Sequence, residues 1–146
     1  IIDIILKTKN FKKEEKLKRE KTEKLLEYTG LVKYTKNRAS SLPYGYQRRL
    51  EIARALATSP SLLVIDEPAA GMNQKETSDL KDFLDKINSD GTSILIIEHD
   101  VKLIMNLCAF VTVLDFGKII CEGVPEMVKK NKNVIEAYLG AWGFEC

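Results

Sequence analysis

Three short apolar runs constrain the fold of this chain more than any other feature. They are SLLVID at 61–66, SILIIEH at 93–99 and FVTVLDF at 110–116. Each run is rich in Leu and β-branched residues, and none alternates apolar with polar positions. Runs of this kind are typical of strands that are covered on both faces, as in a parallel sheet. The sequence therefore predicts an α/β fold in which a parallel sheet is flanked by helices.

Helical patterns lie between and before these runs. In the segment 73–91, four apolar residues recur at the spacing of one helical face, and the pair Asp90-Gly91 marks its end. These four residues are Leu80, Phe83, Leu84 and Ile87. A strand, this helix and the next strand form a crossover, which is right-handed by strong default. The segment 46–60, YQRRLEIARALATSP, predicts a second amphipathic helix.

The end of the chain has its own pattern. The turn FGK at 116–118 is followed by IICEG, which predicts a hairpin with a short returning strand. The tail that begins at Pro125 predicts one or two short helices. The three cysteines, Cys108, Cys121 and Cys146, show no metal-binding spacing, so we expect reduced thiols in a cytosolic protein.

Positive charge is concentrated near the start of the chain. The net charge is +2, yet the segment 7–38 holds twelve Lys or Arg and five Glu. Glu alternates with Lys there, which favours a solvated helix with ion pairs along its surface. Anionic lipid or nucleic acid is the alternative partner for such a segment. It lacks interleaved aromatic residues, so the pattern argues against binding of single-stranded nucleic acid.

Two carboxylates follow the first strand, at the start of the stretch DEPAAGMN. The carboxyl ends of strands in α/β sheets are where ligands bind. Asp66 is placed to hold Mg²⁺, directly or through a water, and Glu67 to orient and polarise an attacking water. Taken without further context, the pair is better explained as two solvated acids at a strand end.

His99 is the single histidine of the chain and follows the second strand in IIEHD. A lone histidine is more often structural than catalytic. If the two strands are adjacent and parallel, however, His99 lies level with Asp66 and Glu67. There its imidazole can donate to a phosphate oxygen and sense the third phosphate of a nucleotide.

The order LPYGYQRRLEIARAL, LLVIDEPAAGMN and ILIIEHD resembles the ATP-binding subunit of ATP-binding cassette (ABC) transporters. The segments RRLEIARAL, DEPAAGMN and VIEAYLG are most similar to those of the branched-chain amino acid importers. The resemblance covers essentially the whole chain. It implies the C-terminal part of a P-loop NTPase core at 41–146, preceded by a remnant of the helical subdomain at 1–40.

The resemblance also implies roles for named residues. Asp66 becomes the Walker B metal residue, Glu67 the water-activating carboxylate and His99 the switch histidine. Two loops are expected to touch nucleotide or the opposite subunit. They are the signature loop with the residue that follows it (Leu42, Pro43, Tyr44, Gly45, Tyr46 and Gln47) and the D-loop (Ala70, Gly71, Met72 and Asn73). Asn73 replaces the usual acid of the D-loop and keeps an acceptor without the charge.

The signature loop departs from the family's usual Leu-Ser-Gly-Gly-Gln, of which Leu42 and Gly45 remain. Pro43 has neither a hydroxyl nor an N–H, so two phosphate donors are missing at that position. The amides of Tyr44, Gly45 and Tyr46 can still face an anion from the start of a helix. A lost hydrogen bond to a charged group costs about 1.5–3 kcal/mol. We therefore expect weakened, not abolished, phosphate binding.

A Walker A loop, G-x-x-x-x-G-K-[ST], is not found in the sequence. The single Gly-Lys pair, Gly117-Lys118, lies in the predicted hairpin and is followed by Ile. In the family, the Walker A loop precedes the part that this chain resembles, and its strand lies between the second and third runs. We therefore expect a gap in the sheet there, and no ATPase activity from this chain alone.

The implied function is an ATPase subunit that binds ATP and Mg²⁺ and powers import of branched-chain or other hydrophobic amino acids. The implied partners are a second ATPase subunit and membrane permease subunits, with no nucleic acid. The implied location is cytoplasmic, on the inner face of the plasma membrane. A degenerate, non-hydrolysing regulatory or binding module is the alternative. Chromosome-maintenance and DNA-repair ATPases share these motifs but insert long coiled coils.

Overall fold

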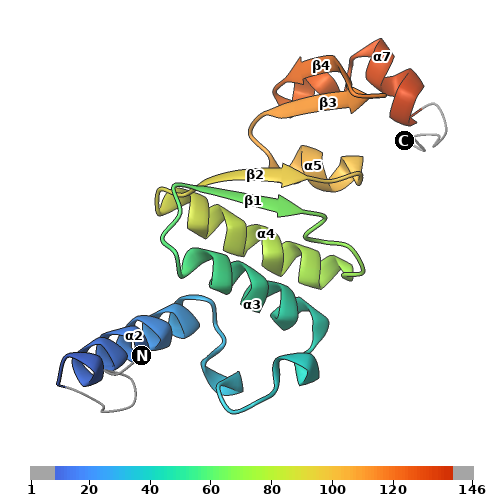
Figure 1. The fold of residues 1–146 in the computed structure, drawn as a ribbon. Helices are drawn as coiled ribbons and strands as arrows, with labels where there is room; N and C mark the ends of the chain where they lie inside the picture. Colours follow the sequence, from blue (N-terminus) through green and yellow to red (C-terminus); the bar gives the residue numbers. More distant parts are fainter. Residues whose placement is uncertain (1–8, 140–146) are drawn as a thin grey trace. The chain divides into compact units, whose positions relative to one another are not determined.

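A computed structural model describes residues 9–139 of the chain (Figure 1). These residues divide into two compact units, one that ends at Ile96 and one that begins at Ile97. The domain boundary predicted at residue 40 falls inside the first unit, and it stays a prediction. Along residues 9–139, each helix is too short or too polar to cross a bilayer.

The first unit places two helices beneath a pair of strands (Figure 1). Its elements are the helices α2 (Lys9–Tyr28), α3 (Tyr44–Leu56) and α4 (Gln74–Ser89), the 3₁₀ turns η1 (Val32–Tyr34) and η2 (Ala39–Ser41), and the strands β1 (Leu62–Asp66) and β2 (Ser93–Ile97). The two strands are paired and run in the same direction (Figure 1). The amide of Ser93 donates to the carbonyl of Ser61 at 3.0 Å, which aligns their starts. The predicted strand–helix–strand unit with adjacent parallel strands is confirmed.

Helix α4 is the central element of the first unit. All four residues predicted for its buried face, Leu80, Phe83, Leu84 and Ile87, are buried. Asn73 caps its start: its side chain accepts from the amide of Glu76, and the Glu76 carboxylate accepts from the amide of Asn73, each at 3.0 Å. This capping box satisfies two amide donors that would otherwise be unpaired at a helix start.

Helix α2 has no fully buried residue and carries ion pairs along its surface. Lys18 pairs with Glu14 at 3.6 Å and Lys16 with Glu20 at 3.9 Å, both across one helical turn. This is the solvated helix that the alternating charges predict. The chain after it is anchored by a small core of Leu31, Leu42 and Ala53, which joins the end of α2 to α3.

The expectation that the strands are covered on both faces is wrong for the described residues of the first unit. Leu63 is buried on the helix side, but Leu62, Val64 and Leu95 are each about half exposed, at 52%, 55% and 51%. The physical reason is that an apolar pattern indicates which residues favour burial, but it does not identify the neighbour that would cover them. Helices α3 and α4 supply cover on one side, so alternate residues of β1 and β2 remain accessible.

The second unit is built on a hairpin. Its elements are α5 (Val101–Leu107), β3 (Val111–Asp115), β4 (Lys118–Gly123), the short helices α6 (Pro125–Val128) and α7 (Lys132–Val134), and the π-helical turn η3 (Ile135–Leu139). Strands β3 and β4 are antiparallel, and the two residues between them, Phe116 and Gly117, have φ values of 45° and 76°. Positive φ at both positions is typical of the hairpin turn whose twist matches the strands. The predicted hairpin is confirmed.

The third apolar run does not join a parallel sheet within the described residues. Its strand, β3, pairs with β4 alone, and β1 pairs with β2, so the described strands form two separate sheets. The gap expected in the sheet between the second and third runs stays a prediction. The core of the second unit consists of Met105, Val111, Val128 and Val134, against which Cys108 and Cys121 pack. Burial raises the pKa of the Cys108 thiol, as suits a thiol that packs rather than reacts.

Tyr28 ties the end of α2 to the end of α4 and generates a prediction about alkaline stability. Its hydroxyl donates to Asp90 Oδ2 at 2.7 Å, and the Lys86 ammonium lies 3.9 Å from its ring centroid. Burial, and then the hydrogen bond to Asp90, raise the pKa of Tyr28 from 10.0 to about 12. The protonated phenol therefore contributes its full stability below pH 10, and this contribution disappears as the pH rises through about 12.

We expect the wild type to be more stable than Tyr28→Phe by about 1 kcal/mol at pH 8, because one hydrogen bond is lost. The difference should shrink steadily above pH 10. Urea unfolding of both proteins from pH 8 to 11.5 measures it, and Phe keeps the ring contacts as a control. A difference that stays constant over this range would contradict the role given to the Tyr28 hydroxyl.

The exposed face of β1 and β2 predicts self-association of the 146-residue chain at micromolar concentration. Accessible strand edges beside apolar side chains favour pairing between molecules. Val64→Lys should reduce the association, because it places a charge in the middle of that face. Leu17→Lys is the matched control, since Leu17 is equally exposed, at 55%, on the solvated helix α2. Sedimentation velocity distinguishes the outcomes, and equal effects of the two variants would refute the assignment.

Candidate functional site

The signature loop is held in place by its first residue and by the residue that follows it. Leu42 is 6% exposed and packs into the core with Leu31 and Ala53. Its carbonyl accepts a hydrogen bond from the side-chain amide of Gln47 at 2.8 Å. Leu42 and Gln47 therefore anchor the loop, and the residues between them are the ones available to a ligand.

Pro43 occupies the N-cap position of α3, with φ −53° and ψ 147°. This backbone conformation suits proline. The Pro43 carbonyl accepts from the amides of Tyr46 at 2.9 Å and Gln47 at 3.1 Å. The Tyr46 amide, which was expected to face an anion, is therefore already used inside the chain. The amides of Tyr44 and Gly45 remain as the donors that the start of α3 presents.

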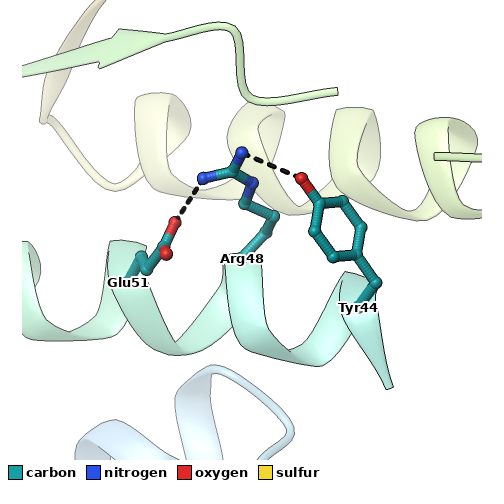
Figure 2. A network of polar contacts seen from close by, with 3 residues as sticks. All are labelled: Tyr44, Arg48 and Glu51. Atoms are coloured by element: carbon teal, nitrogen blue, oxygen red, sulfur yellow. Dashed lines mark hydrogen bonds and ion pairs between the residues drawn. The ribbon is translucent and has the colours of Figure 1, made fainter. Parts of the chain in front are cut away.

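Tyr44 belongs to a polar network on the surface of α3 (Figure 2). The Arg48 guanidinium donates to the Tyr44 hydroxyl at 2.9 Å and to Glu51 at 2.7 Å. The hydrogen bond to Glu51 is the main reason why the pKa of Arg48 lies above its usual value. Charge-assisted pairing to a planar guanidinium fixes direction as well as distance. The network therefore sets where the Tyr44 ring lies.

Tyr46 faces a different neighbourhood. Its ring lies 4.8 Å from the Tyr34 ring, centroid to centroid, and the Lys33 ammonium lies 5.0 Å from the centroid of each. These contacts connect the signature loop to η1. Tyr46 thus helps to attach the loop to the preceding segment.

The D-loop leads directly into α4. Gly71 has φ 77°, a conformation that glycine adopts without strain, and the Met72 amide donates to the Ala69 carbonyl at 3.0 Å. The half-buried Ala70 donates its amide to the Glu67 carbonyl at 3.3 Å. The Asn73 acceptor, expected to be available to a partner, is the oxygen that caps α4. Asn is as good an N-cap as Asp, so the lost charge does not weaken the helix start.

The structure brings the signature loop and the D-loop together. A Cβ atom on Gly71 would lie 3.6 Å from Tyr44 Cε1, and one on Gly45 would lie 3.5 Å from Glu76 Oε1. A shallow hollow beside these contacts is lined by Pro43, Gly45, Tyr46, Arg49, Met72, Glu76, Asp79 and Leu80. Two predicted ligand loops that lie far apart in the sequence are therefore in contact through Tyr44 and Gly71.

Asp66 and Glu67 lie at the end of β1, as predicted, and both are exposed. Glu67 has φ 43°, which is uncommon for a residue with a side chain and is characteristic of strained functional positions. Pro68, which follows, is buried. Within residues 9–139, no cluster of three metal-ligating side chains is present. One exposed carboxylate still fits Mg²⁺, because that ion is commonly held by one or two carboxylates together with phosphates.

His99 follows β2 and belongs to the second unit. Its side chain is 74% exposed, while that of the preceding Glu98 is 2% exposed, and the two side chains approach to 3.8 Å. Asp100 then caps α5 by accepting from the Leu103 amide at 3.0 Å. The placement of His99 beside Asp66 and Glu67 stays a prediction.

Two residues of the site escaped the sequence reasoning, although the sequence contained a signal for each. Arg48 lies four residues after Tyr44 and three before Glu51, which is the spacing of contacts on a helix surface. Glu76 lies three residues after Asn73 at the start of an apolar pattern, which is the spacing of a capping box. Both residues determine how the two loops are held.

Comparisons with known proteins identify the proteins that this chain resembles. Residues 4–70 match a family model described as "ABC transporter", and residues 118–141 match one described as "Branched-chain amino acid ATP-binding cassette transporter". The chain is 42% identical over 137 residues to the high-affinity branched-chain amino acid transport ATP-binding proteins BraF of Pseudomonas aeruginosa and LivG of Escherichia coli (strain K12). Each match covers 93% of this chain and 54% of the relative, so the chain spans about half the length of these proteins.

Solved structures give the same result. The ADP conformation of MJ1267, an ATP-binding cassette of an ABC transporter, is 33% identical with a TM-score of 0.78, over 83% of this chain and 49% of that one. A nucleotide-free ATP-binding cassette from an ABC transporter is 30% identical with a TM-score of 0.79, over 94% and 55%. From its motifs, its fold and these likenesses, the chain belongs to the ABC ATPase family and matches the C-terminal part of the branched-chain amino acid transport ATP-binding proteins.

Proposed function

We propose that this chain supplies the C-terminal, partner-facing elements of an ABC transporter ATPase that powers import of branched-chain or other hydrophobic amino acids. The observation that carries the proposal is the packing of the signature loop against the D-loop, where Tyr44 lies beside Gly71, and against the start of α4, where Gly45 lies beside Glu76. The names of the relatives, which are transport ATP-binding proteins for branched-chain amino acids, support the choice of substrate.

The proposed ligands are ATP and Mg²⁺. The amides of Tyr44 and Gly45, at the start of the 13-residue helix α3, suit the terminal phosphate of a nucleotide held by another subunit. Asp66 would hold Mg²⁺, which neutralises phosphate charge when bound. Glu67 would orient the attacking water, and His99 would donate to a phosphate oxygen. Ala70, Gly71, Met72 and Asn73 would face the opposite subunit.

The proposed assembly follows from this division of roles. A second ATPase subunit would provide the nucleotide that the signature loop meets, and permease subunits in the membrane would receive the motion. The assembly would then lie on the cytoplasmic face of the plasma membrane. Within the chain, residues 1–40 would be the remnant of the helical subdomain and residues 41–146 the C-terminal part of the ATPase core.

A degenerate, non-hydrolysing module derived from the same domain is the second candidate. One observation favours it: Pro43 removes both a hydroxyl and an N–H from the loop that should bind phosphate, and α3 begins without a side-chain cap. The retained pair Asp66 and Glu67, the latter in a strained conformation, favours the active ATPase instead.

Co-assembly tests the ATPase directly. The chain is mixed with a polypeptide that supplies the part preceding it in the relatives, complex formation is verified, and Mg²⁺-dependent ATP turnover is measured. We expect turnover, and we expect Glu67→Gln to lower it by about 100-fold with nucleotide trapped in the complex, because the water-activating carboxylate is lost.

Glu23→Gln is the matched control, since Glu23 is exposed on α2, and it should leave turnover unchanged. A verified complex that does not turn over ATP, and in which Glu67→Gln does not alter nucleotide trapping, would establish the non-hydrolysing module instead.

Replacement of Pro43 separates the structural role of this residue from its role in binding. Pro43→Ser places a hydroxyl at the N-cap of α3, and Pro43→Ala does not. Both variants lose the rigidity of proline equally, so the serine variant should be more stable than the alanine variant by about 1 kcal/mol in urea unfolding.

In the assembled complex, Pro43→Ser should also bind ATP about tenfold more tightly than the wild type, because a donor to phosphate is restored. Equal ATP affinity of the wild type and of both variants would show that the loop does not contact phosphate through this position.

A further inference from the structure

We propose that Arg48 is a positioning residue: through Tyr44, it holds the signature loop against the D-loop so that the two loops move as one. The inference rests on the proposed function, in which both loops face the opposite subunit. Arg48 itself would touch neither nucleotide nor the reacting atoms. It would act through the Tyr44 side chain.

The geometry of the guanidinium is the first support. Arg48 Nη2 donates to the Tyr44 hydroxyl at 2.9 Å, while Nη1 donates to Glu51 Oε2 at 2.7 Å (Figure 2). The three residues lie within two turns of α3, so Glu51 fixes the guanidinium plane and the guanidinium fixes the phenol. The Arg48 side chain is 28% exposed, so these hydrogen bonds are partly shielded from water. A lysine ammonium lacks the planar fork that spans two acceptors in this way.

The position of the Tyr44 ring is the second support. Its edge lies against Gly71, where a Cβ atom would be 3.6 Å from Cε1, 3.8 Å from Cζ and 3.9 Å from the hydroxyl oxygen. Gly71 has φ 77°, so its conformation also disfavours a side chain. The ring therefore takes the space beside the D-loop backbone that glycine leaves open. Any displacement of Tyr44 changes what the D-loop packs against.

A buried donor supplies the third support. Among the described side chains, Arg48 Nε is a buried polar atom without a hydrogen-bond partner. Burial of an unpaired donor opposes folding, so stability alone gives no reason for this arrangement. The orientation that buries Nε is the one in which both terminal nitrogens reach Tyr44 and Glu51. The contacts to Tyr44 and Glu51 therefore accompany an unpaired Nε, and this cost calls for an explanation such as a positioning role.

The coupling has a consequence for catalysis. Pro43 provides no donor, so phosphate recognition depends on the amides of Tyr44 and Gly45 being presented at the correct angle. If Arg48 fixes that angle through the Tyr44 hydroxyl, its loss and the loss of the hydroxyl must have the same effect. The two changes together must then cost no more than either alone.

A double-mutant cycle in the assembled, full-length complex tests this requirement. We expect Tyr44→Phe and Arg48→Met each to lower kcat by about tenfold with little change in KM, and the double variant to show the same loss. Arg48→Lys should not restore kcat. Arg19→Met, at an exposed position of α2, is the matched control and should match the wild type. Multiplicative losses in the double variant, or kcat losses that follow the loss in unfolding free energy across all variants, would overturn the proposal.

A second measurement needs no nucleotide and no turnover. In ¹H–¹⁵N spectra of the 146-residue chain that carries Val64→Lys to suppress self-association, Tyr44→Phe and Arg48→Met should shift the Gly71 amide in the same direction. The Gly91 amide is the control. Its chemical shift should not change, because no other atom lies within 4 Å of a Cβ atom placed on Gly91. If the complex does not turn over ATP but the Gly71 amide shifts in both variants, the proposed ATPase function is refuted, and the proposed coupling between the two loops is supported. If Gly71 does not respond to either variant, the coupling is refuted, whatever the activity.

Discussion

The reciprocal hydrogen bonds between Asn73 and Glu76 are the interaction on which the rest of the site depends. They start α4 at a fixed residue, and α4 carries the buried face of the first unit. They also hold the Glu76 carboxylate beside Gly45, so the start of α4 and the start of α3 are adjacent. Without this cap, the D-loop, which connects β1 to α4, would not be fixed at its α4 end. The signature loop would then have no fixed neighbour.

The uneven cover of β1 and β2 explains how such a precise loop arrangement coexists with an incomplete sheet. Leu63 packs toward the helices, whereas Leu62, Val64 and Leu95 are half exposed on the other face. The loops are positioned from the helix side, through α3 and α4, and not from the exposed face. Their geometry therefore does not require that face to be covered. The proposed nucleotide turnover has a further requirement, which is a Walker A loop.

The sequence was sufficient where local chemistry decides the outcome. The buried face of α4, the ion pairs of α2 and the hairpin at Phe116-Gly117 all follow from spacing and turn residues within one element, and the structure confirms them. The cover of each strand face could not be predicted, because hydrophobicity does not identify the neighbour. The contact between Tyr44 and Gly71 depends on how two helices pack, and no periodicity within either segment reports it. The relation of His99 to Asp66 depends on two units and stays a prediction for the same reason.

Pro43 and Tyr44 illustrate how one loop can lose a ligand contact and keep its shape. Proline suits the φ of −53° at the start of α3, and its carbonyl still closes the first turn through Tyr46 and Gln47. The backbone is therefore preserved while the side-chain donor is absent. The amides of Tyr44 and Gly45 remain as donors to an anion. They can bind it only if the direction of their N–H bonds is fixed. In this chain the groups that fix the loop are the buried Leu42, the side chain of Gln47, which donates to the Leu42 carbonyl, and the Tyr44–Arg48–Glu51 network. In the proposed function, phosphate binding by the loop would therefore depend on neighbours that themselves contact no phosphate.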